Sequence, residues 1–317
     1  MQANKPTSAQ SDAHSAEFTD IDEFTAAMSG WDMDWQQLEA GRPKIQTSVI
    51  SCRETVIQRY YISHKAQQRG SAPDDFATFG FANPKSPMNI GGSNIPELGI
   101  LFNFNNPNGF EMISGSEFVG ISVSFPREKF FHLARQFKID ESQITEGKLA
   151  FAKVSQSDEL GAVRNYLNAL NHGDSDARSK KTFIDTELPY RFLNALAGLA
   201  PEPSSENPTA RRKGLRQALE FIDANAQDNP SIIDICFAVD VSPRSLNRAF
   251  NEYFGIGPKR YLLNLRLLNV RRQLRNTSDD LTKVADIANE WEFWHMGDFA
   301  REYRQFFGEY PAESLNS

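Results

Sequence analysis

A short pattern that occurs twice near the C-terminal end of this 317-residue chain constrains its fold more than any other feature. The first copy reads Leu-Asn-Arg-Ala-Phe at 246–250 and Phe-Gly-Ile-Gly-Pro at 254–258, and the second reads Phe-Ala-Arg-Glu-Tyr at 299–303 and Phe-Gly-Glu-Tyr-Pro at 307–311. Arg301 follows Arg248 by 53 residues, whereas upstream Ile287 follows Ile235 by 52. One residue has therefore been added in the second copy, in the short gap between two helical segments.

Each copy predicts a helix, a tight turn and a second helix. In the first copy, apolar residues recur at helical spacing until Asp240, and Ser242 then begins a new helix as its N-cap, with Pro243 in the first helical position. The second helix of each copy has one apolar face, while its opposite face carries Arg and polar side chains that burial in a core does not explain. This arrangement is typical of a helix-turn-helix, whose second helix enters the major groove of DNA.

Residues from about 212 to 315 resemble the DNA-binding domain of the AraC/XylS family of bacterial transcription regulators. The resemblance covers a leading helix, the first helix-turn-helix, a long connecting helix at 258–274 and the second unit ending at 307–311. The stretch Phe-Trp-His-Met-Gly-Asp-Phe-Ala at 293–300 also resembles the branch that contains ethanolamine-operon and amine-responsive regulators.

This resemblance implies which side chains face DNA in the two units. Arg248 and Arg301 occupy equivalent positions, and an Arg fork matches guanine O6 and N7 or a phosphate. The alternative for each is a solvated surface Arg. The residues expected to contact DNA are Arg244, Ser245, Asn247, Arg248, Asn251, His295, Met296, Asp298 and Arg301.

Three positions depart from the pattern of this family. Gly297 offers no side chain to a base edge, so the second unit reads sequence less stringently or relies on DNA shape. Asp240 and Glu292 stand at the turn where relatives frequently have Gly, and a non-Gly residue at positive φ is uncommon. Glu292 therefore carries modest strain, or the longer second turn relieves it. The aromatic residues around this turn, Trp291, Phe293 and Trp294, are expected to form the core of the second unit rather than to stack on nucleic acid.

The remainder of the chain predicts an α+β protein with an N-terminal sensory domain before the helical one. Residues 1–17 are polar and are expected to be a disordered tail. Within the sensory and dimerisation domain, 18–200, a short helix capped by Thr19 or Asp20 precedes several β-branched and aromatic strands from Lys44 onward, which indicate a small barrel or jelly roll. Helical patterns follow Pro126. The proline-rich segment 201–208 is the expected linker, and 209–317 the DNA-binding domain.

Charge and composition fit this division. The chain has 34 Lys and Arg against 41 Asp and Glu, a net charge of −7, yet residues 209–317 contain 15 of each sign. The acidic excess therefore belongs to the N-terminal part, which is not expected to touch phosphates. No apolar run approaches the roughly 20 residues that cross a bilayer, and the first residues lack an apolar signal core. Two cysteines, Cys52 and Cys236, lie in different domains without metal-binding spacing, so a cytoplasmic location is expected.

The N-terminal domain has no pattern of an enzyme or metal site. Its histidines are isolated, and no nucleophile motif or phosphate-binding loop occurs, so we expect no catalytic residues, metal or cofactor. Phe79, Phe81, Phe102 and Phe104 alternate along their strands and are expected to pack in the core, although one set could line a cavity.

By its resemblance the chain is expected to be a homodimer that binds a small-molecule effector and engages RNA polymerase. Two alternatives remain, an N-terminal domain that binds a partner protein and a barrel enzyme fused to a DNA-binding domain. The residues identify neither the effector nor the target genes, and do not distinguish an activator from a repressor.

Overall fold

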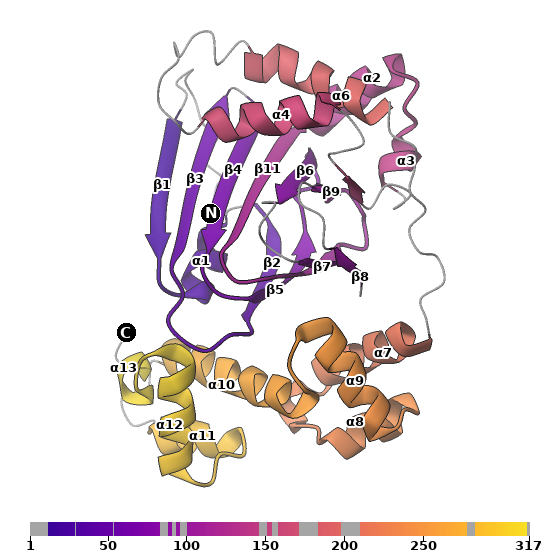
Figure 1. The fold of residues 1–317 in the computed structure, drawn as a ribbon. Coiled ribbons are helices and arrows are strands. Elements are labelled where there is room, and N and C mark those ends of the chain that lie inside the picture. Colours follow the sequence, from indigo (N-terminus) through magenta and orange to yellow (C-terminus); the bar gives the residue numbers. More distant parts are fainter. Residues whose placement is uncertain are drawn as a thin grey trace.

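The structure of the chain is a computed structural model that describes residues 12–28, 30–52, 54–82, 88–90, 93–95, 100–145, 151–153, 158–170, 183–197, 210–277 and 283–315. An N-terminal region of sheets and helices lies between residues 12 and 197, and a C-terminal region of helices between 210 and 315 (Figure 1). The predicted α+β class is confirmed. The expected linker, 201–208, lies outside the described residues.

Two antiparallel sheets build the N-terminal region. The larger has the order β1-β3-β4-β11-β6-β9-β12, with β1 (Asp12–Phe18), β3 (Ile45–Cys52), β4 (Thr55–Ile62), β6 (Phe76–Ala82), β9 (Ile100–Asn103), β11 (Phe118–Pro126) and β12 (Phe151–Lys153). The smaller has the order β2-β5-β10-β7-β8, with β2 (Asp32–Gln37), β5 (Ala66–Ser71), β7 (Met88–Ile90), β8 (Ser93–Ile95) and β10 (Phe110–Ser114). The described strands form two separate sheets, so they do not close into a barrel, and a jelly-roll-like sandwich describes them better.

The inner faces of the two sheets meet across an aromatic core. Because side chains alternate along a strand, Tyr60 and Ile62 of the larger sheet point inward, where they join Trp35 and Met112 of the smaller one. Helix α1 (Ile21–Ala27) closes this core with the fully buried Phe24. Its N-cap is Asp20, one of the two predicted caps, whose carboxylate accepts hydrogen bonds from the amides of the first turn at 2.8 and 2.9 Å.

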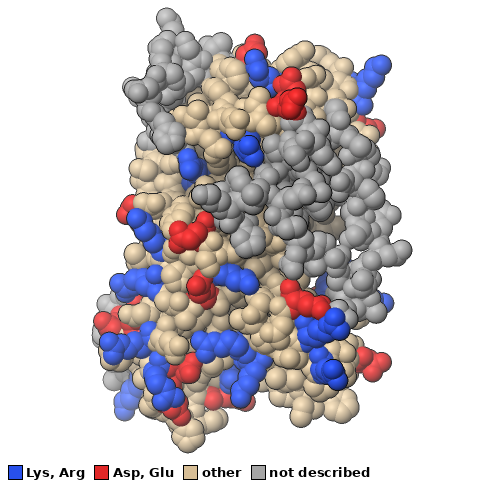
Figure 2. Space-filling model, in the orientation of Figure 1, with Lys and Arg blue, Asp and Glu red and all other residues tan. Residues whose placement is uncertain are grey.

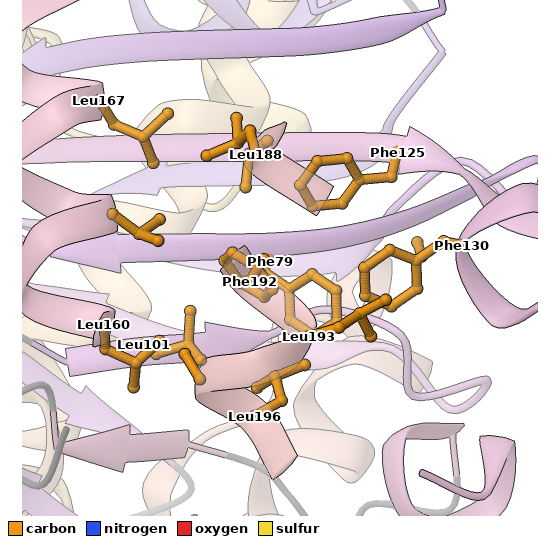
Figure 3. Packing of buried hydrophobic residues seen from close by; sticks show 14 of the residues in the cluster. Phe79, Leu101, Phe125, Phe130, Leu160, Leu167, Leu188, Phe192, Leu193 and Leu196 are labelled. Carbon is orange, nitrogen blue, oxygen red and sulfur yellow. The ribbon is translucent and has the colours of Figure 1, made fainter. Parts of the chain in front are cut away.

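Helices cover the other face of the larger sheet. They are α2 (Arg127–Gln136), α3 (Glu141–Thr145), α4 (Asp158–Ala169), the π-helical turn η3 (Phe183–Glu187) and α6 (Leu188–Ala197). Phe192 of α6 packs with its ring centroid 4.7 Å from that of Phe79 and 5.6 Å from that of Phe125 (Figure 3). These helices lie where the sequence predicts them after Pro126, and they bury a second apolar layer.

The strands separate the four alternating phenylalanines into two packing layers. Phe79 and Phe81 point toward the helices, whereas Phe102 and Phe104 lie in the core between the sheets. All four are therefore core residues.

The predicted tail differs from the structure at its end, because Asp12–Phe18 forms strand β1, paired antiparallel with β3 at the sheet edge.

Seven α-helices of the described chain form the C-terminal region. They are α7 (Ala210–Ala224), α8 (Ile232–Val239), α9 (Pro243–Phe254), α10 (Pro258–Asn276), α11 (Val284–Glu290), α12 (Met296–Phe307) and α13 (Pro311–Leu315), with a 3-10 turn η4 (Ala226–Asp228) after α7. Helix α10 runs between two compact groups, α7–α9 on one side and α11–α13 on the other (Figure 1).

The C-terminal region packs directly on the outer face of the smaller sheet. Leu38 and Ile113 join the apolar core of helices α7–α10. The fully buried Tyr261 of α10 donates hydrogen bonds from its hydroxyl to the amide oxygens of Gln67 at 3.1 Å and Gln36 at 3.4 Å. Burial raises the pKa of this hydroxyl above its ordinary range. The smaller sheet is thus covered on both faces, which makes the two regions parts of one packed structure.

A buried ionic cluster joins three segments at the other end of α10. The guanidinium of Arg271, only 4% exposed, pairs with the α1 cap Asp20 and, at 2.9 Å, with Glu309, which follows α12. Arg275 approaches the same Asp20 carboxylate at 2.7 Å. Burial alone would raise the pKa of Glu309, but the hydrogen bond from Ser314 and the charge of Arg271 lower it below its ordinary value. The contribution of Glu309 to stability is therefore present at neutral pH and is lost as the pH falls through that lowered pKa.

We expect Arg271→Ala to lower the free energy of unfolding by about 3–5 kcal/mol, because it removes the most deeply buried of the cations that pair with the carboxylates of Asp20 and Glu309. Arg272→Ala is the matched control. Its neighbouring guanidinium also bridges the regions, to Asp22 at 2.9 Å, but is 37% exposed, so the loss should stay below about 1 kcal/mol. Urea unfolding of both variants measures the difference, and equal losses would contradict this account of the cluster.

Candidate DNA-binding surface

The first helix-turn-helix consists of α8 and α9. Ser231 and Asp234 form a capping box at the start of α8. Ser242 caps α9 by accepting a hydrogen bond from the amide of Ser245 at 3.2 Å, and Pro243 occupies the first turn, as the sequence predicts. Helix α9 ends at Gly255, whose φ of 70° provides the left-handed cap.

The second unit repeats this geometry with α11 and α12. Gly308, with φ 73°, ends α12 as Gly255 ends α9. The turns begin alike, because the amide of Phe293 donates to the carbonyl of Ala288 just as the amide of Val241 donates to that of Cys236. Each second helix then starts at equivalent positions, so the residue added in this copy is Trp294.

The two turn residues that replace glycine both adopt left-handed backbone conformations. Asp240 has φ 51° and Glu292 has φ 61°. The longer second turn therefore does not relieve Glu292, because the inserted Trp294 follows the left-handed position rather than replacing it. Of the two alternatives for Glu292, the backbone angle therefore supports the strained one.

The predicted core of the second unit is correct for two of three aromatic residues. Trp291 and Phe293 are partly buried against its apolar cluster, and the Trp291 indole donates a 2.8 Å hydrogen bond to Gln273. Trp294 is 68% exposed, so its expected place in the core is wrong. The reason is its position as the extra residue of the turn, where the chain bulges out of the packed layer.

The apolar side of each recognition helix faces inward and places the expected DNA-contacting residues outward. Leu246 and Phe250 of α9, and Phe299 and Tyr303 of α12, are buried. The half-buried Met296 is the least accessible of the expected residues. The exposed ones are Arg244, Ser245, Asn247, Arg248, Asn251, His295, Asp298 and Arg301. Their contact with DNA stays a prediction.

Short-range contacts hold several of these side chains in place. Arg248 donates to Glu252 at 2.8 Å and Arg301 pairs with Asp298 at 2.8 Å, each within its own helix. The Asn251 amide donates to the backbone carbonyl of Asn247 at 2.7 Å. Exposed pairs of this kind contribute little to stability, so a phosphate or guanine can replace the carboxylate partner at small cost. The two equivalent arginines are thus tethered in opposite directions, Arg248 toward the C-terminal end of its helix and Arg301 toward the N-terminal end.

Charges of both signs are mixed over this region. Figure 2 shows Lys and Arg side chains gathered on the part of the molecule formed by the C-terminal helices, with Asp and Glu between them. A Cβ built on Gly297 in the first turn of α12 meets nothing within 4 Å, so packing does not require glycine there. Gly297 therefore leaves a position without a side chain on the exposed face of α12.

Sequence reasoning missed two large apolar side chains on the surface of α8. Phe237 is 83% exposed and Ile233 is 61% exposed, one helical turn apart. The signal was the composition of this helix, Ile-Ile-Asp-Ile-Cys-Phe-Ala-Val, which is more apolar than one buried face requires. A continuous apolar run does not reveal which side is buried.

The described residues contain no group of three or more His, Cys, Asp or Glu arranged to hold a metal ion. Cys52 and Cys236 form no disulfide, and both are buried. Among the described helices, none combines the length and the apolar character needed to cross a bilayer.

Comparison with known proteins places the C-terminal helices in a recognised group. Residues 235–317 match the helix-turn-helix domain family. The chain is 34% identical over 159 residues to the XylDLEGF operon transcriptional activator of Pseudomonas putida, over 49% of this chain and 50% of that protein. It is 25% identical over 210 residues to the HTH-type transcriptional activator RhaS of Enterobacter sp. (strain 638), over 66% of each. The chain therefore spans about half the length of the first curated relatives it matches.

A solved structure also resembles part of the chain. It is a transcriptional regulator from Chromobacterium violaceum, described as an AraC-type DNA-binding domain-containing protein, and it is 32% identical. The match covers 33% of this chain and 91% of that chain, with a TM-score of 0.30.

We expect Glu292→Gly to be more stable than Glu292→Ala by about 1 kcal/mol, because glycine adopts positive φ without the clash of a Cβ. Both substitutions remove the same carboxylate and its 3.8 Å contact with Arg266, so their difference isolates the backbone. Thermal and urea unfolding of the pair provide the measurement. Equal stability would show that the turn carries no strain.

Proposed function

We propose that this chain is a sequence-specific DNA-binding transcription regulator of the AraC/XylS type, controlled through its N-terminal region and not an enzyme. The match of residues 235–317 to a helix-turn-helix domain family and the similarity to a transcriptional activator support this proposal. The division proposed is a sensory and dimerisation part at 18–200 and a DNA-binding part at 209–317. The observation that carries the proposal is the pair of exposed, equivalent recognition helices joined by one long helix.

The length of α10 supports simultaneous binding by both units. Its 19 residues span about 28 Å at the ordinary helical rise. One turn of DNA separates successive major-groove faces by about 34 Å. Helix α9 precedes α10, and α12 follows it after α11, so the two recognition helices lie toward opposite ends of α10 and are suited to adjacent turns of one duplex (Figure 1).

The N-terminal region is proposed to sense a small molecule between its two sheets. Gln68 is fully buried there, opposite Trp35 and Met112 on the paired strands, and both of its amide atoms lack a hydrogen-bond partner among the described residues. The indole N–H of Trp35 also lacks one. Unpaired buried polar groups are costly, so a ligand that offers a donor and an acceptor would be bound favourably.

Transmission would use the packed contact between the regions. A ligand that shifts the smaller sheet displaces the surface against which α10 and α12 rest, and so changes the relative population of arrangements that fit DNA. We propose cytoplasmic homodimers that activate transcription with RNA polymerase. Two relatives, the XylDLEGF operon activator and RhaS, are described as transcriptional activators, which supports activation over repression. Membership of the amine-responsive branch, based on residues 293–300, stays a prediction.

Arg248→Ala is expected to weaken specific DNA binding by about 1–3 kcal/mol and to relax the preference at one base position. Arg164→Ala in α4 is the control, because it removes the same charge from the opposite end of the molecule (Figure 1). Duplexes found by genome-wide footprinting with the full chain supply the target, and titrations across salt concentrations separate specific from phosphate binding. Unchanged affinity and base preference in Arg248→Ala would show that Arg248 does not contact DNA.

Gln68→Leu is expected to stabilise the ligand-free protein by about 1–3 kcal/mol, because leucine fills a similar volume without unpaired amide atoms. Gln58→Leu, at a partly exposed position in β4, is the control and should change stability little. Urea unfolding in the absence of ligand measures both. A destabilised Gln68→Leu would mean that the amide already has a partner in the free protein.

A further inference from the structure

A pocket of about 380 Å³ lies between the two helix-turn-helix units, on the side of α10 away from the N-terminal region. Ile222 of α7 and Ile232 at the start of α8 form one wall, Leu262 and Leu265 of α10 the floor, and Glu292 in the turn of the second unit the far rim. The volume is within the range of small-molecule sites, and the walls are largely apolar, as in most such sites.

The guanidinium of Arg266 in this pocket has few polar partners. The guanidinium of Arg266 makes no hydrogen bond within the described residues. Its nearest carboxylate, that of Glu292, is 3.8 Å away and half exposed, and its other partner is the ring of Phe293 at 5.3 Å. Burial lowers the pKa of Arg266, and the charge of Glu292 offsets this only in part. Lys259 adds a second, exposed cation to the same lining.

The largely apolar pocket and the guanidinium of Arg266 together favour a ligand that has both a carboxylate and a hydrocarbon body. A carboxylate can accept two parallel hydrogen bonds from a guanidinium, and displaces only a long and exposed ion pair in doing so. The apolar walls favour a hydrocarbon body over a bare inorganic anion or a DNA phosphate, neither of which would bury them.

From these observations we propose that the DNA-binding region has its own ligand site, in which Arg266 binds the carboxylate of a compact apolar acid. This site is separate from the Gln68 position between the sheets, and its existence does not depend on the proposed function. Its rim carries Glu292, four residues before Met296 begins α12. Occupancy therefore connects the first unit directly to the start of the second recognition helix.

The proposal is tested by isothermal titration calorimetry of the full chain with 4-phenylbutanoate. We expect submillimolar binding, weakened about tenfold or more in Arg266→Gln, because a charge-assisted pair is lost. Ile233 is an exposed residue of the pocket lining, and Ile233→Glu should weaken binding similarly through like-charge repulsion. Circular dichroism verifies that each variant is folded.

Arg216→Gln on the exposed surface of α7 is the matched control and should bind as the original chain does. The neutral analogue 4-phenylbutan-1-ol tests the carboxylate, and inorganic phosphate tests the apolar walls; both should bind at least tenfold more weakly. Absence of binding to the original chain overturns the proposal. So does binding that persists in Arg266→Gln, which would belong to another site, or equal binding of either comparison ligand.

Discussion

The buried charge of Arg271 determines how the three main parts of the molecule are joined. Its guanidinium lies between the cap of α1 in the N-terminal region and Glu309 beyond the second recognition helix, while its own helix, α10, connects the two reading units. Since a buried charge is tolerated only with its partners in place, any arrangement that separates these segments is strongly disfavoured. The orientation of α10 relative to the sheets follows from this requirement.

The two reading units depend on the N-terminal region in different ways. The first shares an apolar core with the sheet through Leu38 and Ile113. The second is held at the end of α12 by hydrogen bonds to the carbonyl of Phe306, from the amide of Gly41 at 2.9 Å and the side chain of Gln37 at 3.4 Å. The first unit also has directional contacts with the sheet, because Arg69 of β5 pairs with Asp223 of α7 and Tyr261 donates to Gln67. A displacement of the sheet would therefore disturb directional contacts to both units.

Local features of the helical half could be predicted from sequence because each depends on neighbouring residues. Ser242 before Pro243, and glycine after Phe254 and Phe307, specify helix ends without reference to distant contacts. The turn at Glu292 was indicated only by the resemblance, which left open whether the longer second turn relieves its backbone. The sandwich was predictable only in outline, since strand β1 depends on pairing with β3. Long-range juxtapositions such as Arg271 with Asp20, or the pocket at Arg266, leave no periodic signal in the sequence.

The contact between the smaller sheet and α10 limits which N-terminal regions can be joined to this C-terminal region. Tyr261 of the C-terminal region and its glutamine partners, Gln36 and Gln67 of the N-terminal region, form one hydrogen-bonded group. A chimaera joined at 201–208 would set a foreign sheet against this tyrosine and leave its hydroxyl buried opposite mismatched side chains. Exchange of the N-terminal region between related chains would therefore require matching substitutions around Tyr261.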